Sequence, residues 1–430
     1  MNVMPRRYGI VSPPAIGHLN PMVALGQELQ RRGHGVVVFT VADGARRLEG
    51  LPLEVVTIGE TAFPPGAVDK AYAVLGRLSG MAGLRFSVDY FRREQAMLDA
   101  ELPEAVAGAG VDGLLVDQLS PAAGTVAESL GLPFITICNA LPVNREAAVP
   151  PYFTHWQPSR KPWARWRNQL GNALLEGLTA PLWRDLQDQR RRRGLVPHRH
   201  KEESLSPLLQ LAQLPREFDF PRRRLAPQFH YVGRLADPSG REPLLRDAVP
   251  FPWERLDGRP LIYASLGTLQ NGRPELFAQI AEACAPLAAQ VVISLGNPTS
   301  VPLDLPGNPI VVAYAPHQAL IARATLVISH AGLNTTLTAL GCGVPVLAIP
   351  ITNEQPGIAA RLAACGAGRV LPVGRLAMEP LRAMVNEMLV NPTYRGQAQR
   401  LQTAIQAAGG VVTAADLIER ATAPQGESMG

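Results

Sequence analysis

A pattern of strand, turn, helix and strand between residues 326 and 349 constrains the fold of this chain most strongly. Residues 326–329 form a short apolar run with the length of a buried strand, and a second run at 344–349 follows a helix-forming segment. A strand, a helix and a second strand in this order form a parallel βαβ unit. The pattern therefore predicts an α/β domain whose ligand site lies beyond the carboxyl ends of its strands.

The turn between this strand and its helix has the composition of an anion-binding site. Asn334 and Thr335 are good helix-starting residues, and the free N–H groups and dipole of a helix N-terminus attract phosphate. Gly332 allows the backbone to approach a ligand closely, and His330 can donate a hydrogen bond to the same phosphate. Taken alone, His330 is equally well explained as a structural residue that caps the turn. The surrounding residues, in this order, favour the anion site.

The N-terminal half of the chain follows the same plan. Its first predicted strand, at residues 8–11, is followed by His18, and two later apolar runs end at Asp117 and Asn139. The carboxyl ends of parallel strands share one edge of a sheet, so we expect these three side chains to lie on the same side of the molecule. The alternative for Asp117 is a simple helix cap.

His18 and Asp117 together have the composition of an acid–base pair. A carboxylate on one ring nitrogen fixes the imidazole tautomer and leaves the other nitrogen to accept a proton from a hydroxyl group. In the C-terminal half, Ser265 and Thr268 lie at the end of a predicted strand, in a loop that is either a phosphate cradle or a plain turn. The sequence has no D-x-D motif for a divalent cation, so we expect no metal site.

Length and composition bound the class of protein. A chain of 430 residues is expected to form two domains, and its net charge of +5 does not by itself indicate a nucleic-acid partner. The four cysteines lack a C-x-x-C pair, which is typical of free thiols in a reducing compartment. Neither a signal peptide nor an apolar run long enough to span a bilayer is evident, so a cytoplasmic protein is expected.

Residues 155–201 differ from the rest of the chain, because tryptophans alternate there with arginines and lysines. A charged run is usually a solvated face, and that is the default interpretation. The interleaved tryptophans leave an alternative, which is peripheral contact with the inner face of a membrane. No nucleic-acid recognition motif accompanies these basic residues.

Taken together, the stretch 311–357 resembles the nucleotide-sugar signature of family 1 UDP-glycosyltransferases, which have the two-Rossmann-domain GT-B fold. The resemblance covers nearly the whole chain, and within the family it is similar to the bacterial zeaxanthin glucosyltransferases. The segments that carry this second likeness are residues 111–118, 130–134, 140–146 and 264–270.

The family fold implies two Rossmann-like domains that face each other across a cleft. We expect an acceptor domain at 1–235, a linker at 236–258, a nucleotide-sugar domain at 259–412, and a final helix and tail at 413–430 that return to the first domain. The implied donor is UDP-glucose, with no other cofactor, and the implied acceptor is a lipophilic hydroxyl compound, zeaxanthin above all.

The resemblance also implies roles for individual residues. His18 and Asp117 match the catalytic dyad, Tyr314 and His317 lie where the family contacts the uracil base, and Glu354 and Gln355 match the residues that hold the sugar hydroxyls. Asn139 would reach the sugar from the first domain. The phosphates would be held by Ser265, Thr268, His330, Gly332, Asn334 and Thr335.

The sequence departs from the family signature in two places, and in the first of them Tyr314 and His317 stand where the family usually has tryptophan and glutamine. An acid normally stands eight residues after the histidine and binds the ribose, whereas this chain has Thr338 there. Other readings therefore remain: a glucosyltransferase for a sterol, polyketide or macrolide, or a nucleotide-sugar-binding protein without catalysis. A UDP-sugar epimerase is disfavoured, because no further acid lies near the sugar site and the dyad is present.

Overall fold

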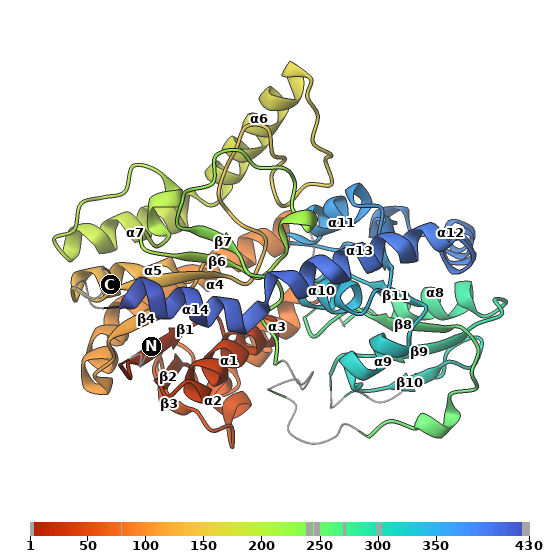
Figure 1. The fold of residues 1–430 in the computed structure, drawn as a ribbon, viewed down its shortest axis with the longest axis horizontal. Helices are drawn as coiled ribbons and strands as arrows, with labels where there is room; N and C mark the ends of the chain where they lie inside the picture. The colour runs from red at the N-terminus through yellow and green to blue at the C-terminus, as the bar shows by residue number, and fades with distance from the viewer. Residues whose placement is uncertain are drawn as a thin grey trace, which may run out of the picture.

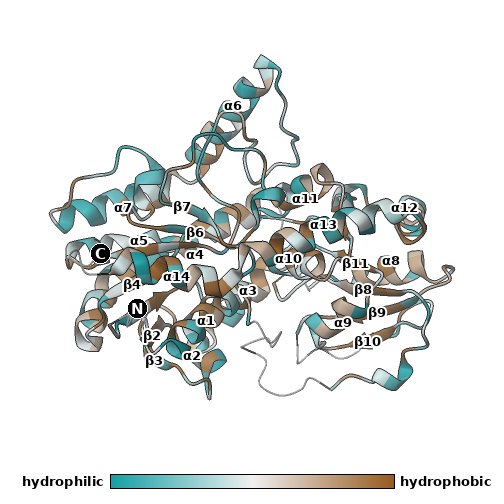
Figure 2. Ribbon diagram, in the orientation of Figure 1, coloured by the Kyte–Doolittle hydropathy of each residue, from teal (hydrophilic) through white to brown (hydrophobic). Residues whose placement is uncertain are grey.

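The computed structural model describes residues 4–78, 80–237, 244, 250–269, 272–297, 300 and 303–423, which form two parallel sheets flanked by helices (Figure 1). The strands are mostly hydrophobic, and hydrophilic residues gather on outer helices such as α7 (Ala180–Arg192; Figure 2). Parallel sheets need this arrangement because both of their faces must be covered. The predicted fold class, an α/β protein with two Rossmann-like domains, is confirmed.

The first sheet has the strand order β3-β2-β1-β4-β5-β6-β7, and its paired strands run parallel. The strands β4 and β5 are buried along their whole length, as their continuous apolar sequences predict. The strand bounds are β1 (Arg7–Val11), β2 (Gly35–Thr40), β3 (Glu54–Thr57), β4 (Gly113–Asp117), β5 (Phe134–Cys138), β6 (Gln210–Ala212) and β7 (Phe229–Tyr231).

Helices cover both faces of this sheet, and the long helix α4 packs against α5 and α7. Besides α7, the helices of this domain are α1 (Ile16–Arg31), α2 (Ala42–Leu48), α3 (Ala67–Leu75), α4 (Gly80–Ala109), α5 (Pro121–Ser129), α6 (Pro162–Leu178), and the short helices η1 (Lys201–Ser204) and η2 (Arg216–Phe218). In Figure 1 the helix α6 projects from the top of the molecule.

The second sheet has the strand order β10-β9-β8-β11-β12-β13, again with parallel pairs. Its strands are β8 (Leu261–Ser265), β9 (Gln290–Ser294), β10 (Ile310–Val312), β11 (Leu326–Ser329), β12 (Val346–Ala348) and β13 (Gly368–Val370). The associated helices are η3 (Trp253–Arg255), α8 (Pro274–Cys284), α9 (His317–Arg323), α10 (Leu333–Gly341), α11 (Gln355–Ala364), η4 (Val373–Arg375), α12 (Met378–Val390) and α13 (Pro392–Ala408).

The last helix, α14 (Gly410–Thr422), packs on α1 of the first domain, and Figure 1 shows α13 and α14 crossing between the domains. The break between these helices needs glycine, because Gly409 and Gly410 have φ angles of 82° and 60°. On the first domain, α14 is fixed by Arg32, which bonds Asp416 and Glu419 at 2.6 and 2.9 Å. The tail 424–430, and most of the linker expected at 236–258, lie outside the described residues.

The two domains share a hydrophobic core. One continuous cluster of buried side chains contains Leu214 and Phe218 from the first domain and Leu333, Leu337 and Ile405 from the second. Burial of this kind is the dominant favourable term in domain association, so the two domains pack against each other over an apolar surface. Among the described residues, no helix is both long enough and apolar enough to cross a bilayer.

A buried ionic cluster joins the domains at the same interface. Asp219, from the first domain, accepts hydrogen bonds from Arg222 at 2.6 Å and from Tyr231 at 2.8 Å. Its other carboxylate oxygen accepts from Arg361 of α11, in the second domain, at 2.8 Å. Burial alone would raise the pKa of Asp219, but the two guanidinium groups outweigh it and lower that pKa. The carboxylate is therefore ionised and neutralises cations from both domains.

We expect Asp219→Ala to lower the free energy of unfolding by about 3–5 kcal/mol, because it leaves two guanidinium groups buried without their anion. Urea denaturation followed by circular dichroism measures the loss. The matched control is Asp257→Ala, which removes an exposed carboxylate paired with Arg259 and should leave the unfolding midpoint unchanged. Equal stability of Asp219→Ala and wild type would show that this cluster does not hold the domains together.

Candidate functional site

The predicted histidine–aspartate pair forms in the structure. His18 lies in the first turn of α1, the helix that follows β1, and Asp117 is the last residue of β4, the strand paired with β1. Their side chains meet with 2.8 Å between His18 Nδ1 and Asp117 Oδ2, and Asp117 is completely buried. The topological expectation that these residues share one sheet edge is confirmed. Nε2 of His18 is the ring nitrogen left for a substrate.

Asp117 is held by several donors besides His18. Oδ2 accepts from the amide of Asn139 at 2.8 Å and lies 3.4 Å from the hydroxyl of Ser12, while Oδ1 accepts from the backbone N–H of Leu119 at 2.9 Å. Donors of this kind stabilise the ionised form of a carboxylate. The amide nitrogen of Asn139 is engaged by Asp117, so Asn139 positions the pair, and its contact with the sugar stays a prediction.

The charges around His18 favour its protonated form. Burial would lower the pKa of His18, but the charge and hydrogen bond of Asp117, and then the charges of Glu354 and Glu94, outweigh it and raise that pKa. Glu354 belongs to the second domain, where it precedes α11. A carboxylate from each domain therefore acts on the same imidazole, and the site is formed between the domains.

Glu94 is a site residue that the sequence analysis missed. It lies on α4, it is buried, and its carboxylate is 3.4 Å from the hydroxyl of Ser120, three residues beyond Asp117. Burial, followed by the negative charge of Asp117, raises the pKa of Glu94 to about 8. The sequence indicates this residue only as an acid among the regularly spaced apolar residues of α4. The spacing alone does not show which face of the helix packs against the sheet.

On the second domain, His330 follows β11 and faces the same interdomain region. Its ring lies between two glycines: a Cβ at Gly267 would come within 2.6 Å of the ring, and one at Gly332 within 2.5 Å. Gly332 makes room for the imidazole, and its close approach to a ligand stays a prediction. The intervening Ala331 has a φ of 64°, a strained conformation for a residue with a Cβ, and such strain concentrates at functional sites.

The helix α10 begins one residue earlier than the side-chain pattern predicted. Gly332 is its N-cap, and neither Asn334 nor Thr335 caps the helix. Instead, Asn334 bridges the domains, since its amide donates to the carbonyl of Gly17 at 2.6 Å and accepts from Gln213 at 3.0 Å. The first-turn N–H groups of α10 keep the orientation required for an anion.

The histidines of the second domain are neutral at physiological pH. Burial lowers the pKa of His330 to about 4, against the opposing effect of the Ser265 backbone. Burial, with the charge of Arg234 and then of His330, lowers the pKa of His317 to about 3. His317 is the first residue of α9, and its Nδ1 lies 3.2 Å from the hydroxyl of Tyr263. Neutral imidazoles can donate only through one N–H group.

The remaining predicted donor-site residues lie along the strand ends of the second sheet. Ser265 ends β8 and its hydroxyl accepts from the N–H of Gly267 at 3.2 Å, and Thr268 is half-buried in the following turn. Tyr314 is half-buried in the loop between β10 and α9. Thr338 is buried within α10 and donates to the carbonyl of Asn334 at 2.7 Å, so its hydroxyl is used inside the helix.

Gln355 and Glu354 have different environments despite being adjacent. Gln355 is buried, and its side-chain oxygen accepts from the N–H groups of Ile351 and Thr352 at 2.8 and 3.0 Å. It therefore stabilises the loop before α11. Glu354 is half-buried, and burial together with the charge of Asp117 raises its pKa, against its own backbone hydrogen bond and the charge of His18. Of the two, Glu354 is the side chain available to a ligand.

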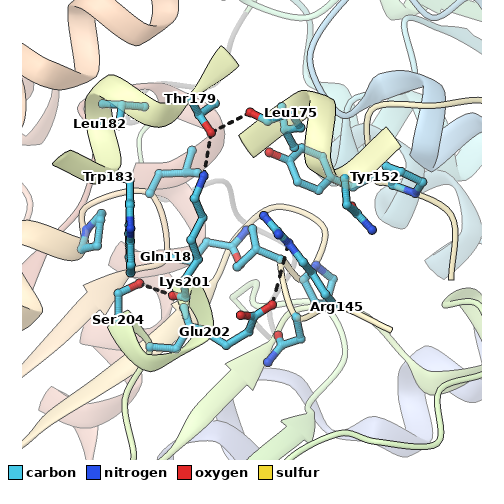
Figure 3. Close-up of a pocket in the computed structure, with 18 of the residues that line it drawn as sticks. Gln118, Arg145, Tyr152, Leu175, Thr179, Leu182, Trp183, Lys201, Glu202 and Ser204 are labelled. Carbon is cyan, nitrogen blue, oxygen red and sulfur yellow. Dashed lines mark hydrogen bonds and ion pairs between the residues drawn. The ribbon is translucent and has the colours of Figure 1, made fainter. Parts of the chain in front are cut away.

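A cavity of roughly 200 Å³ opens beside the pair, lined by Gln118 and Leu119 directly after Asp117. Figure 3 shows Trp183, Tyr152 and Leu175 around it, with polar groups from Arg145 and Lys201. The ammonium of Lys201 donates to Thr179 at 2.7 Å. Burial, then the charge of Arg145, lowers the pKa of Lys201 to about 8, while Glu202 opposes them.

Several polar atoms at this cavity have no hydrogen-bond partner among the described residues. They are Oε1 of Gln95, Oε1 of Gln118, Oδ1 of Asn144 and Nη2 of Arg361. A buried polar atom without a partner is costly unless a ligand or water satisfies it. The cavity therefore combines an apolar wall with amide oxygens that can accept from hydroxyl groups. No group of three or more metal-ligating side chains was found in the described part of the chain.

Known proteins are similar to this chain in sequence and in fold. Residues 197–406 match the family model described as UDP-glucoronosyl and UDP-glucosyl transferase. The chain is 37% identical to a zeaxanthin glucosyltransferase of Pseudescherichia vulneris, over 97% of this chain and 98% of that protein. It is 32% identical to one of Pantoea ananas, over 96% and 95%. The fold matches the glycotransferase of kitacinnamycin with a TM-score of 0.74 and 23% identity, over 97% of this chain and 100% of that one.

The raised pKa of Glu94 predicts a pH-dependent stability. The unfolded glutamate ionises near pH 4.5 and the folded one near pH 8, so folding takes up a proton between these values and stability falls as pH rises through that window. Between pH 6 and pH 9 the free energy of unfolding of wild type should fall by about 2–3 kcal/mol because of Glu94. Glu94→Gln takes up no proton on folding and should lack this part of the fall.

Chemical denaturation at both pH values measures this difference, with Glu104→Gln on the exposed side of α4 as the matched control. Wild type and control should share one pH slope and Glu94→Gln should have a shallower one. Three identical slopes would mean that Glu94 ionises normally in the folded chain.

Proposed function

The chain belongs to the UDP-glucoronosyl and UDP-glucosyl transferase family, and we propose that it transfers glucose from UDP-glucose to a hydroxyl of a lipophilic acceptor, zeaxanthin above all. It is a glycosyltransferase by its family. The observation that carries the more specific proposal is the His18–Asp117 pair. Gln118, next to Asp117, lines a cavity with apolar walls, and the carbonyl of Gly17, next to His18, is bonded by Asn334 in the first turn of α10. The names of the two curated relatives support zeaxanthin as the acceptor.

His18 is the general base in this proposal. Nε2 takes the proton from the acceptor hydroxyl while that oxygen attacks the anomeric carbon of glucose. The bond from the anomeric carbon to the diphosphate breaks on the opposite side, so the configuration inverts and no covalent enzyme intermediate forms. The proton remains on His18, where Asp117 stabilises the imidazolium through the 2.8 Å contact at Nδ1.

The leaving diphosphate is stabilised by dipoles of the second domain. The first-turn N–H groups of α10, at Asn334 and Thr335, supply the N-terminal end of the helix dipole, and neutral His330 donates one N–H group. Ser265 and Thr268 add hydroxyl donors. We propose that these groups serve without a divalent metal, and that UDP-glucose is the only small molecule required besides the acceptor.

The residues that contact the uracil and the glucose of the donor are assigned from the family resemblance and from their positions. Tyr314 and His317 would contact the uracil from the loop before α9. Glu354 would accept from the glucose hydroxyls, which fits its half-buried position and its influence on His18. Gln355 would hold the loop before α11 through its side-chain oxygen and would donate to a glucose hydroxyl through its amide nitrogen. Thr338 leaves the ribose without the family's acid.

The cavity is proposed to hold the end group of the acceptor. At roughly 200 Å³ it is smaller than the 300 Å³ or more that is usual for drug-sized ligands, so only one ring of a long molecule would fit. Trp183 and Leu175 offer apolar contacts, and the oxygen of Gln118 can accept from a ring hydroxyl. A sterol, polyketide or macrolide alcohol is the alternative acceptor, and contact with a membrane is part of this proposal because each of these acceptors is lipophilic.

Incubation of the purified protein with UDP-glucose and detergent-solubilised zeaxanthin should give products heavier by one or two hexoses, which mass spectrometry of the extract detects. The yield should be the same with and without EDTA. UDP release with other lipid alcohols but not with zeaxanthin would change the acceptor and keep the enzyme class. Binding of UDP-glucose without UDP release from any acceptor would leave a binding protein.

His18→Ala should lower kcat by about 10²–10⁴-fold, the usual contribution of a general base, and leave the affinity for UDP unchanged. His200→Ala, an exposed histidine, is the matched control. Asp117→Asn should also lower kcat and should move the acid limb of the pH–rate profile to lower pH, because Asp117 raises the pKa of His18. A pH profile that does not move would separate Asp117 from the proton transfer.

A further inference from the structure

One face of α6 exposes an unbroken row of large hydrophobic side chains. Trp163, Trp166, Leu170 and Leu174 are exposed by 54, 75, 74 and 59%. Their spacing of three, four and four residues places them along one stripe of the helix. Isolated exposed apolar residues are normal, whereas a contiguous row on a projecting helix indicates an interaction surface (Figure 1).

The opposite face of α6 fixes the helix to the protein, so the exposed stripe cannot turn inward. Asn168 is buried and donates to the carbonyl of Ala147 at 3.0 Å. Gly171 packs so closely that a Cβ there would come within 2.9 Å of Trp156 and Pro151. The stripe is therefore the permanent outer surface of a helix whose orientation is set from inside.

The charge beside the exposed stripe is mainly positive, since Glu176, the one acid of α6, is paired with Arg145. Residues 155–175 contain four lysines and arginines and neither aspartate nor glutamate. Arg160, Lys161 and Arg165 are exposed, and none of them pairs with an acid in the described part of the chain. The fourth, Arg167, lies over the rings of Trp156 and Trp163, at 4.6 and 5.2 Å from their centroids. This end of α6 is complementary to an anionic surface.

The arginine run of α7, which the sequence analysis grouped with α6, is a different kind of surface. Arg190 pairs with Glu128, Arg191 with Asp188, and both Arg192 and Arg193 with Asp99. Acids of the first domain thus neutralise these cations, and the default interpretation of a solvated, structural charge run holds for them. Within residues 155–201, exposed tryptophan occurs together with unpaired positive charge only on α6 and the residues just before it.

We propose that α6 docks the protein on an anionic lipid bilayer, with its hydrophobic stripe inserted at the interface and Arg160, Lys161 and Arg165 among the head groups. Amphipathic helices with tryptophan and leucine on one face and basic residues beside it lie in the interface in this way. Each basic residue near an anionic leaflet adds to the attraction, and tryptophan is favoured at head-group depth.

Docking through α6 places the cavity next to the membrane. Asn172 and Leu175, on the other face of the same helix, line the cavity beside Asp117. A lipophilic acceptor would therefore move from the bilayer past α6 into the site without crossing bulk water. This consequence rests on the proposed function, whereas the membrane docking itself does not.

Co-sedimentation of the full chain with vesicles tests the docking. Wild type should bind vesicles of phosphatidylcholine with 30% phosphatidylglycerol more tightly than vesicles of phosphatidylcholine alone, and the difference should shrink as salt is added. Trp166→Ser with Leu170→Ser should weaken binding at least about tenfold, because two large apolar side chains no longer insert. Replacing Arg160, Lys161 and Arg165 by glutamine should remove the preference for phosphatidylglycerol.

The matched control is Val196→Ser with Val390→Ser, which removes two exposed apolar side chains elsewhere and should leave binding unchanged. Circular dichroism melting confirms that each variant is folded. Absence of vesicle binding by wild type, or binding that the α6 variants do not weaken, overturns the proposal. Concentration-dependent self-association that the same variants abolish, without vesicle binding, would reassign the stripe to a second copy of the chain.

A transfer assay separates this inference from the proposed function. With acceptor embedded in vesicles, the Trp166→Ser, Leu170→Ser variant should be slower than wild type, and with the same acceptor in detergent the two should be equal. If wild type binds vesicles but transfers glucose to no acceptor, the proposed function fails and the docking stands.

Discussion

The carboxylate of Asp219 has the most extensive influence on this structure. It is buried between the domains and binds Arg222 and Tyr231 on one side and Arg361 on the other. Arg361 belongs to α11, the helix that begins directly after Glu354. The position of Glu354 opposite His18 thus depends on a salt bridge made two turns further along the same helix.

The two sides of the site differ in how their histidines are charged. His18 is surrounded by Asp117, Glu94 and Glu354, and these acids raise its pKa despite burial. Among the described residues no acid has a comparable effect on His330 and His317, so burial lowers the pKa of both. One residue type therefore serves as a base on the first domain and as a neutral hydrogen-bond donor on the second. The difference follows from the distribution of carboxylates and not from the extent of burial.

The sequence was most informative where function follows from topology. His18 and Asp117 could be placed together because the carboxyl ends of parallel strands share an edge, and the two-domain α/β fold followed from the alternation of strands and helices. It was least informative where a contact joins distant segments. Glu94 could not be identified because the apolar spacing of α4 leaves its rotation open, and Asp219 and Arg361 are 142 residues apart. Nor could the sequence show that Asn139 and Gln355 each have a partner within the protein, Asp117 for the first and the backbone before α11 for the second.

The final helix has a consequence for how the protein is made. The hydroxyl of Tyr8, in the first strand, is hydrogen-bonded to that of Thr422 at 2.7 Å, and Val411, Ala414 and Ile418 complete the apolar layer over α1. The N-terminal domain therefore leaves the ribosome with part of its core uncovered, and it remains so until α14 has been translated. Domains usually fold in the order in which they are synthesised. Here the first domain to emerge is completed only after the second domain has been synthesised, because α14 follows that domain in the chain.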